Sequence, residues 1–267
     1  MNKKQRIRTS TKYFLVSAAS LLAFFLFWQL ITDVLHLMPA YSLPSPVSVI
    51  QSLIKKMSSK SPDGSTLPVH IWTSLKTSML AFFVAAVLGV PLGIMMAWHK
   101  KVDLFVKPVF DLLRPIPPIG WIPIMILLLG IGIWAKVAVI FIGAFIPCVI
   151  NAYTGIKQTS TIHIWVGQTF GASRRQLLWK VAIPTALPVI FTGLKVALGI
   201  AWMTLVAAEL LASTKGLGYM IQVARTIGRA DIIVVGMLVI GVVGLLLSYL
   251  LDVLESVFVK GRYGCKK

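Results

Sequence analysis

Residues 164–184 read Ile-Trp-Val-Gly-Gln-Thr-Phe-Gly-Ala-Ser-Arg-Arg-Gln-Leu-Leu-Trp-Lys-Val-Ala-Ile-Pro, a basic stretch between long apolar segments. Gly171 can adopt the positive φ that ends a first short helix, and Ser173 suits the N-cap of a second. In that second helix Leu177, Leu178 and Val181 share one side. The stretch therefore predicts a helix, a turn and a second helix.

Arg174 and Arg175 fall in the first turn of the second helix, where the helix dipole disfavours cations. A loop that stood alone would gain nothing from this placement. We therefore expect an acidic or polar surface of another protein to receive the two side chains.

The composition is that of an integral membrane protein. Of 267 residues, 57% are hydrophobic and 13% are charged, and the mean hydropathy is +0.87, outside the range of soluble globular chains. A formal charge of +18 would suggest a nucleic-acid partner if it formed one patch, but it is divided among short loops. We expect no nucleic-acid binding.

The apolar segments predict an all-α protein with six transmembrane helices. About 20 helical residues cross the hydrocarbon core of a bilayer. Six segments qualify, at residues 13–32, 75–98, 108–131, 134–156, 186–208 and 232–254. The first is longer than the apolar part of a signal peptide and no clear A-x-A site follows it, so we expect it to be retained.

The distribution of lysine and arginine predicts the topology. Of the 26 basic residues, 17 lie in or beside the segments 1–12, 98–114, 157–185 and 259–267, and only seven lie in the intervening outer segments. The positive-inside rule therefore places both termini and the 157–185 loop in the cytoplasm. The expected organisation is a basic cytoplasmic N-terminus at 1–12, a transmembrane helix at 13–32, an external segment at 33–74, a core at 75–258 and a basic cytoplasmic tail at 259–267.

Local patterns refine this organisation. Ser45 and Pro46 can start a short external helix that runs to about Met57. Residues 114–118, Arg-Pro-Ile-Pro-Pro, lack three backbone donors, which predicts either a kinked helix entry or irregular backbone that lines a cavity. Residues 213–231 predict a short re-entrant or surface helix.

Small residues mark expected helix contacts. Gly89 and Gly93 form a G-x-x-x-G pattern in the second span, and Gly236, Gly241 and Gly244 give the last span small faces. Such faces allow helices to approach closely.

The acidic residues argue against catalysis and metal binding. The eight carboxylates leave residues 112–208 without any Asp or Glu, and none lies in the middle of a predicted span. Paired-carboxylate chemistry and carboxylate metal sites are therefore not expected, and a proton-driven carrier is disfavoured. Cys148 and Cys265 have no neighbours at metal-ligand spacing, so neither a disulfide nor a zinc site is expected. We expect no enzyme activity.

A few polar groups inside spans are candidate translocation-path residues. Lys195 lies near the cytoplasmic start of the fifth span, where it can snorkel or pack against the loop, or can favour an anion that leaves the path. Asn151 and Thr154 on the fourth span need polar partners or water.

Glu209 ends the fifth span and allows two interpretations. It can pair with Lys215 or Arg225 at the helix end, or it can form an external gate with Met203 and Thr204.

The chain lacks a nucleotide-binding loop of the Walker type, since no Gly-Lys dipeptide occurs in it. If the machine is driven by ATP, another subunit binds the nucleotide. Such a subunit needs a mechanical contact, and residues 164–184 are the only sizeable cytoplasmic candidate.

Several motifs, in order, resemble one family. Gly171-Ala172-Ser173 with Leu177-Leu178 and Ala182-Ile183-Pro184 is similar to the cytoplasmic loop signature E-A-A-x3-G-x9-I-x-L-P of ABC-importer permeases. Five further stretches resemble the nitrate, sulfonate and taurine branch of that family. They are Leu43-Pro44-Ser45-Pro46, Leu113-Arg114-Pro115-Ile116-Pro117-Pro118, Phe191-Thr192-Gly193-Leu194-Lys195, Ala208-Glu209 and Gly216-Leu217-Gly218-Tyr219-Met220-Ile221. The likeness extends from about residue 40 to 258. One departure is that Trp165, Val166 and Gly167 stand where the family has Glu-Ala-Ala, which removes the acidic residue.

The resemblance implies a type I ABC importer permease in a bacterial inner membrane. Its expected partners are a second copy of itself, two cytoplasmic ATP-binding subunits, an external substrate-binding protein and membrane lipid. ATP is expected on the partner subunits, with no cofactor in this chain. The coupling loop between helices four and five would contact the ATPase through residues Gly171, Ala172, Ser173, Arg174, Arg175, Leu177, Leu178 and Pro184.

The expected function is ATP-driven import of a small anionic solute of the sulfonate, taurine or nitrate kind. The alternatives are a permease for a vitamin precursor or another small organic solute, a stand-alone carrier or channel, and a membrane anchor or scaffold.

Overall fold

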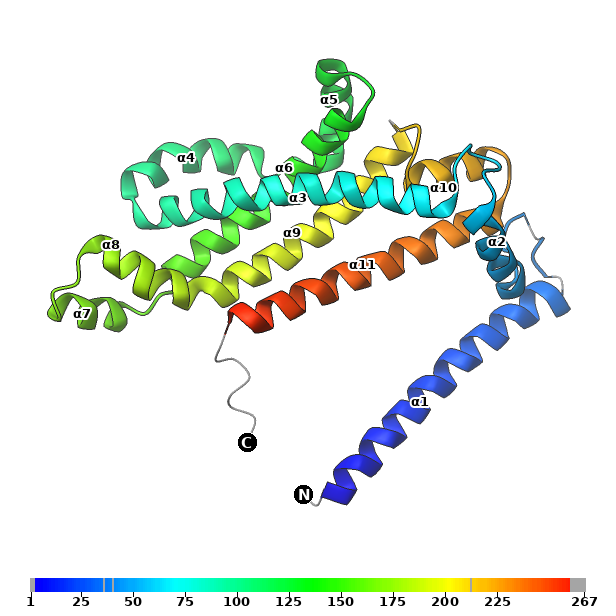
Figure 1. Ribbon diagram of the computed structural model, residues 1–267, viewed down its shortest axis with the longest axis horizontal. Helices are drawn as coiled ribbons and strands as arrows, with labels where there is room; N and C mark the ends of the chain where they lie inside the picture. The colour runs from blue at the N-terminus through cyan, green and yellow to red at the C-terminus, as the bar shows by residue number, and fades with distance from the viewer. Residues whose placement is uncertain (1–2, 36, 40, 212, 260–267) are drawn as a thin grey trace. The chain divides into compact units, whose positions relative to one another are not determined.

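The computed structural model describes residues 3–35, 37–39, 41–211 and 213–259, and its regular elements there are all helices (Figure 1). This confirms the predicted all-α fold. The elements are α1 (Lys3–Gln29), η1 (Leu30–Val34), α2 (Pro46–Ser58), α3 (Leu67–Trp98), α4 (Lys100–Leu113), η2 (Pro118–Trp121), α5 (Ile122–Leu129), α6 (Ile133–Lys157), α7 (Thr161–Thr169), α8 (Arg174–Leu177), η3 (Leu178–Ala182), α9 (Ile183–Leu211), α10 (Leu217–Thr226) and α11 (Ala230–Phe258).

Candidate membrane spans agree with the prediction of six when one bent pair is counted as a span. Five helical stretches of the described chain are long and apolar enough, namely Leu15–Val34, Leu67–Trp98, Ile133–Lys157, Arg174–Leu211 and Ala230–Phe258. The sixth is the pair Lys100–Leu113 and Pro118–Leu129, which is bent by 85°. Figure 1 shows this bend between α4 and α5.

The bend lies at the proline-rich residues 114–118. Pro115, Pro117 and Pro118 lack the backbone N–H that a continuing helix needs, and each also disfavours a helical conformation in the residue before it. α4 therefore ends at Leu113, and the chain restarts in the 3-10 turn η2. Both expected features are present, because the helical path is bent here and the irregular residues 114–117 include Arg114, which lines a cavity of about 190 Å³.

α3 begins at Leu67, well before the predicted start at residue 75. The first turns of α3 carry polar residues, which made the segment resemble an external loop. In the fold, however, His70 and Ser74 are fully buried, and both make hydrogen bonds to residues near the start of α10. Tertiary contacts therefore satisfy the polar groups that a sequence window counts against a span.

Packing divides the chain into two compact units, which we describe separately. One contains the residues up to Pro68 together with Met220–Leu238, and the other contains Val69–Tyr219 and the residues from Val239 onward. The second unit holds most of the helical core.

In the second unit α6 packs against α3 and α9 through small residues. A Cβ at Gly93 of α3 would lie 2.9 Å from the Cβ of Ala152 on α6, and one at Gly155 of α6 would lie 3.2 Å from that of Ala186 on α9. A Cβ at Gly193 of α9 would overlap the side chain of Asn151. Without these Cβ atoms the helix backbones approach closely, as small-residue faces allow in a bilayer. The expected packing role of Gly93 is confirmed.

The first unit contains the short helix α2, which begins as predicted. Ser45 is the N-cap and its hydroxyl accepts a hydrogen bond from the Ser48 amide at 3.3 Å, while Pro46 occupies the first turn. The same unit joins α2 to the start of α11, because Ser52 donates to Asp231 at 2.5 Å. Asp231 also accepts two hydrogen bonds from Arg229, which raises the pKa of that guanidinium.

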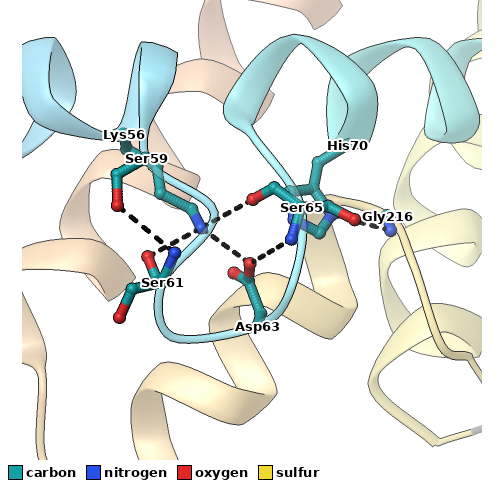
Figure 2. A network of polar contacts seen from close by, with 7 residues as sticks. All are labelled: Lys56, Ser59, Ser61, Asp63, Ser65, His70 and Gly216. Carbon is teal, nitrogen blue, oxygen red and sulfur yellow. Dashed lines mark hydrogen bonds and ion pairs between the residues drawn. The ribbon is translucent and has the colours of Figure 1, made fainter.

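A buried lysine holds the loop that follows α2 (Figure 2). Lys56 is only 2% exposed, and its Nζ donates to Asp63 at 2.6 Å, to the Ser65 carbonyl at 2.8 Å and to the Ser61 carbonyl at 3.0 Å. All three acceptors come from the loop, so one ammonium group fixes its course. Burial of such a charge is tolerated only when it is paired and hydrogen-bonded.

We predict that Gly93→Ala lowers the free energy of unfolding by about 1–3 kcal/mol, because the added methyl group overpacks the contact with α6. The matched control is Gly199→Ala on α9, where a Cβ would meet nothing within 4 Å. This control should be neutral or stabilising by up to about 1 kcal/mol from helix propensity. Thermal unfolding of the purified protein in detergent measures both. Equal effects of the two substitutions would contradict the packing assigned to Gly93.

We predict that Lys56→Met costs about 3–5 kcal/mol, because it removes the cation that the buried Asp63 carboxylate faces. Lys55→Met is the matched control, since Lys55 is the exposed neighbour on the same helix. Thermal unfolding and the rate of limited proteolysis in the 58–66 loop should both change for Lys56→Met only. A Lys56→Met protein as stable and as protease-resistant as the control would show that the network does not hold the loop.

Candidate functional site

Residues 161–182 form the predicted helix, turn and second helix. α7 ends at Thr169, and Gly171 follows with φ +76°, the left-handed conformation that favours glycine. The Ser173 hydroxyl accepts a hydrogen bond from the Gln176 amide, and the Gln176 side chain accepts one from the Ser173 amide at 2.8 Å. This capping box fixes the start of α8.

The predicted boundary at residues 185 and 186 implied that the second helix ends before the fifth span. In the structure it does not end there. α8 passes through the π-helical turn η3 into α9, so that Arg174–Leu211 is one helical stretch (Figure 1). Pro184 lacks the amide that would bond to the carbonyl of residue 180 in an α-helix. The wider turn of η3 lies directly before this proline, as expected where the usual ladder is interrupted. α8 and α9 are therefore parts of one helical stretch, interrupted only by the π-helical turn η3.

Buried and exposed side chains lie close together along this segment. Leu177 is 2% exposed, and Leu178 packs against the cluster that includes Ile156 and Ala186. Arg174 and Arg175 are exposed, so both side chains are accessible to another protein. The exposed aromatic residues of the same segment are Trp165, Phe170 and Trp179. Exposed aromatic and arginine side chains together are typical of protein interfaces.

Lys195 is a residue of α9, and its side chain is paired with two carboxylates of α11. Its Nζ contacts Asp252, and it donates to Glu255 at 2.5 Å. Asp252 and Glu255 lie on successive turns of α11, and Glu255 is 5% exposed. The charge of Lys195 is thus compensated locally, and the cluster joins the two helices.

Glu209 lies near the C-terminal end of α9, away from the end that continues from α8. Its carboxylate is 1% exposed and accepts hydrogen bonds from the Ser74 hydroxyl at 2.9 Å and from the Gly218 amide at 3.0 Å. Ser74 in turn accepts from the Leu217 amide at 2.9 Å. The carboxylate therefore lies at the N-terminus of α10, where the helix dipole favours an anion. Neither Lys215 nor Arg225, the two partners expected from the sequence, is among the described hydrogen-bond or ion-pair partners of Glu209.

The loop before α10 is shaped around the same carboxylate. Gly216 has φ +126°, and a Cβ there would overlap the carboxylate of Glu209. Its amide donates to His70 Nδ1 at 3.0 Å, a contact drawn in Figure 2. Glycine at this position allows the backbone to approach the carboxylate.

The remaining predicted path residues do not share one surface with Glu209. Met203 is 75% exposed and Thr204 is 7% exposed, so these neighbours on α9 point to different sides. Asn151 on α6 is half-buried and donates to the Pro147 carbonyl at 2.9 Å. Thr154 borders a cavity of about 190 Å³ between α4 and α6.

Several functional contacts were not visible in the sequence. Ser74, His70, Asp252 and Glu255 were not singled out, although they hold the candidate residues in place. Their only signal was polarity near the ends of apolar spans, and nothing in that signal identifies the partner.

Comparison with known proteins identifies the family. Residues 89–262 match the family described as binding-protein-dependent transport system inner membrane component. The taurine transport system permease protein TauC of Escherichia coli K12 is 38% identical over 85% of this chain and 82% of its own length. The putative aliphatic sulfonates transport permease protein SsuC of Bacillus subtilis is 33% identical over 88% and 83%. The nitrate import permease protein NrtB of Synechocystis is 33% identical over 82% and 81%.

A solved structure shares the fold. The MetNI methionine ABC transporter in an inward-facing conformation aligns with a TM-score of 0.60 at 21% identity, over 72% of this chain and 94% of the matched chain. Together with the family match and the relatives, this likeness supports a permease fold for the chain. The chain belongs to the binding-protein-dependent transport system inner membrane component family, and it is a multi-pass permease of the ABC importer type.

Proposed function

We propose that this chain forms the translocation path of an ATP-driven importer for a small solute that carries an oxyanion, such as a sulfonate, taurine or nitrate. The names of the relatives support this class of solute. The observation that carries the mechanism is the capped helix–turn–helix of residues 161–182 with its exposed arginines and aromatic rings.

Coupling to ATP hydrolysis is assigned to this segment. Two ATP-binding subunits bind the nucleotide and contact the loop 157–185, and this chain itself holds no cofactor and breaks no bond. The residues that make or support the contact are Gly171, Ala172, Ser173, Arg174, Arg175, Leu177, Leu178 and Pro184. Because α8 continues into α9, a push on the loop would move the end of the helix that carries Glu209.

The assembly proposed here contains a second copy of this chain and an external binding protein. The chain lies in a bacterial inner membrane with both termini in the cytoplasm, which the charge distribution supports. ATP would close the nucleotide-binding subunits, and the resulting movement would turn the path from inward-facing to outward-facing.

Path-lining roles are assigned first to the accessible groups. Asn151, Thr154 and Met203 are partly or largely exposed, so they can contact a solute. We assign Lys195, Thr204 and Glu209 to the wall behind the path, since Glu209 is enclosed and Lys195 is compensated by carboxylates.

The first test concerns the contact with the ATPase. We predict that Arg174→Glu combined with Arg175→Glu abolishes co-purification of the ATP-binding subunit. The introduced carboxylates would repel the acidic or polar surface that we expect to receive the arginines. The folded state should be unaffected, since both side chains are exposed. The matched control is Lys100→Glu combined with Lys101→Glu, which reverses two exposed charges at the start of α4.

Two results would contradict the proposal. One is capture of the ATPase by the arginine variant at the level of the control. The other is solute transport in liposomes by this chain alone, which would indicate a stand-alone carrier.

The second test concerns Lys195. We predict that Lys195→Gln lowers the free energy of unfolding by about 1–3 kcal/mol, because charge-assisted hydrogen bonds to α11 are lost and two carboxylates then face each other. The KM for solute uptake by the Lys195→Gln transporter should not change. The solute is identified beforehand by a thermal-shift screen on the binding protein. Adding Glu255→Gln should restore part of the stability. An increase in KM without loss of stability would instead place Lys195 in the path.

A further inference from the structure

One face of α4 carries charges of alternating sign. Asp103, Lys107, Asp111 and Arg114 follow one another at intervals of four, four and three residues, which keeps them on one side of the helix. All four border the cavity of about 190 Å³ that Tyr153 and Thr154 of α6 close from the other side. Ligand sites are concave and carry a few convergent polar groups, and this cavity has both features.

The carboxylate of Asp103 is only half satisfied. Its Oδ2 accepts a hydrogen bond from the Tyr153 hydroxyl at 3.2 Å. Its Oδ1 is buried and has no hydrogen-bond partner within the described part of the chain. A buried carboxylate oxygen without a donor is costly, so a cationic donor placed at this oxygen would be stabilising.

Lys107 provides the opposite charge beside it. Its Nζ lies 5.9 Å from the centre of the Tyr153 ring and 3.7 Å from Asp111. The Lys107 and Asp111 side chains are 55% and 48% exposed. An ion pair this long and this accessible contributes little stability, about 0–1 kcal/mol. An anion that enters the cavity can therefore replace Asp111 at Lys107 at small cost.

We infer that this cavity binds a short zwitterion, with its ammonium group on Asp103 and its oxyanion on Lys107. The two side chains originate one helical turn apart, about 6 Å along the axis, which suits a molecule whose charges are separated by two or three carbons. The inference rests on the proposed function, because it assigns the substrate class that passes this point of the path. A simple anion such as nitrate would leave Asp103 uncompensated and would bind less well.

Two sources could supply this chemistry. One is a soluble amino-sulfonate or amino-carboxylate that the importer carries. The other is a phosphatidylethanolamine headgroup, in which an ammonium group lies two carbons from a phosphate. Both present the same two charges to Asp103 and Lys107, so the experiment must separate them.

The decisive measurement compares matched probes on the purified chain in lipid-free detergent. Equilibrium dialysis gives the binding of radiolabelled taurine, and competition gives the binding of ethanesulfonate, which lacks the amine, and of ethylamine, which lacks the oxyanion. We expect taurine to bind at least tenfold more tightly than either. Equal binding of taurine and ethanesulfonate, or no binding of taurine, would overturn the inference. This comparison needs no ATPase and no variant, so its failure would leave the coupling proposal intact.

Two variants assign the charges separately. Asp103→Asn should weaken taurine binding at least tenfold and leave ethanesulfonate unchanged, whereas Lys107→Gln should weaken both probes. The control is Asp33→Asn, an exposed carboxylate far from α4 in the sequence, which should change neither. An Asp103→Asn protein that still prefers taurine over ethanesulfonate would contradict the placement of the amine.

Nanodiscs distinguish the two sources. Taurine should bind equally in phosphatidylglycerol discs with and without phosphatidylethanolamine if the site is for a soluble solute. If phosphatidylethanolamine displaces taurine, the same cavity takes a lipid headgroup. Absence of taurine binding in detergent and in phosphatidylglycerol discs would overturn both versions.

Discussion

α6 and α9 meet through glycines, and the positions of the functional groups depend on this contact. Gly155 lies against Ala186, and the lack of a side chain at Gly193 leaves room for the side chain of Asn151. In a bilayer, lipid tails are as apolar as leucine, so close van der Waals packing must replace the hydrophobic effect in holding helices together. Because α9 is continuous with α8 at one end and reaches Glu209 at the other, its packing on α6 positions both residues 161–182 and the cluster around Glu209.

Three charged groups that lie within the described fold are compensated by nearby partners. Lys195 is compensated by two carboxylates of α11, Glu209 is held by Ser74 and a helix N-terminus, and Lys56 is enclosed by a loop. Lys56 and Glu209 are buried, and a buried charge is costly when its partner is removed. These clusters therefore hold neighbouring elements of the structure together. The half-satisfied Asp103 differs from them, and this difference marks the α4–α6 cavity as a binding site rather than a contact between elements.

The sequence predicted the elements whose causes are short-range. Positive φ at Gly171 and capping by Ser173 both depend on neighbours within a few residues, and the structure has both. Two boundaries were wrong for long-range reasons. The start of α3 was placed too late because buried Ser74 looked external, and the second helix of the loop was separated from α9 because the π-turn before Pro184 has no simple sequence signature.

By itself the sequence determined the number of apolar spans, the side of the membrane that its charges favour, and the helix–turn–helix, since these follow from composition, spacing and local capping. Only the tertiary structure decided which groups meet. Lys195 is hydrogen-bonded to Glu255, which is 60 residues away in the sequence, and Glu209 is hydrogen-bonded to Ser74, which is 135 residues away. Hydropathy and spacing record what each residue prefers but not its partner, because a pairing exists only once the helices have packed.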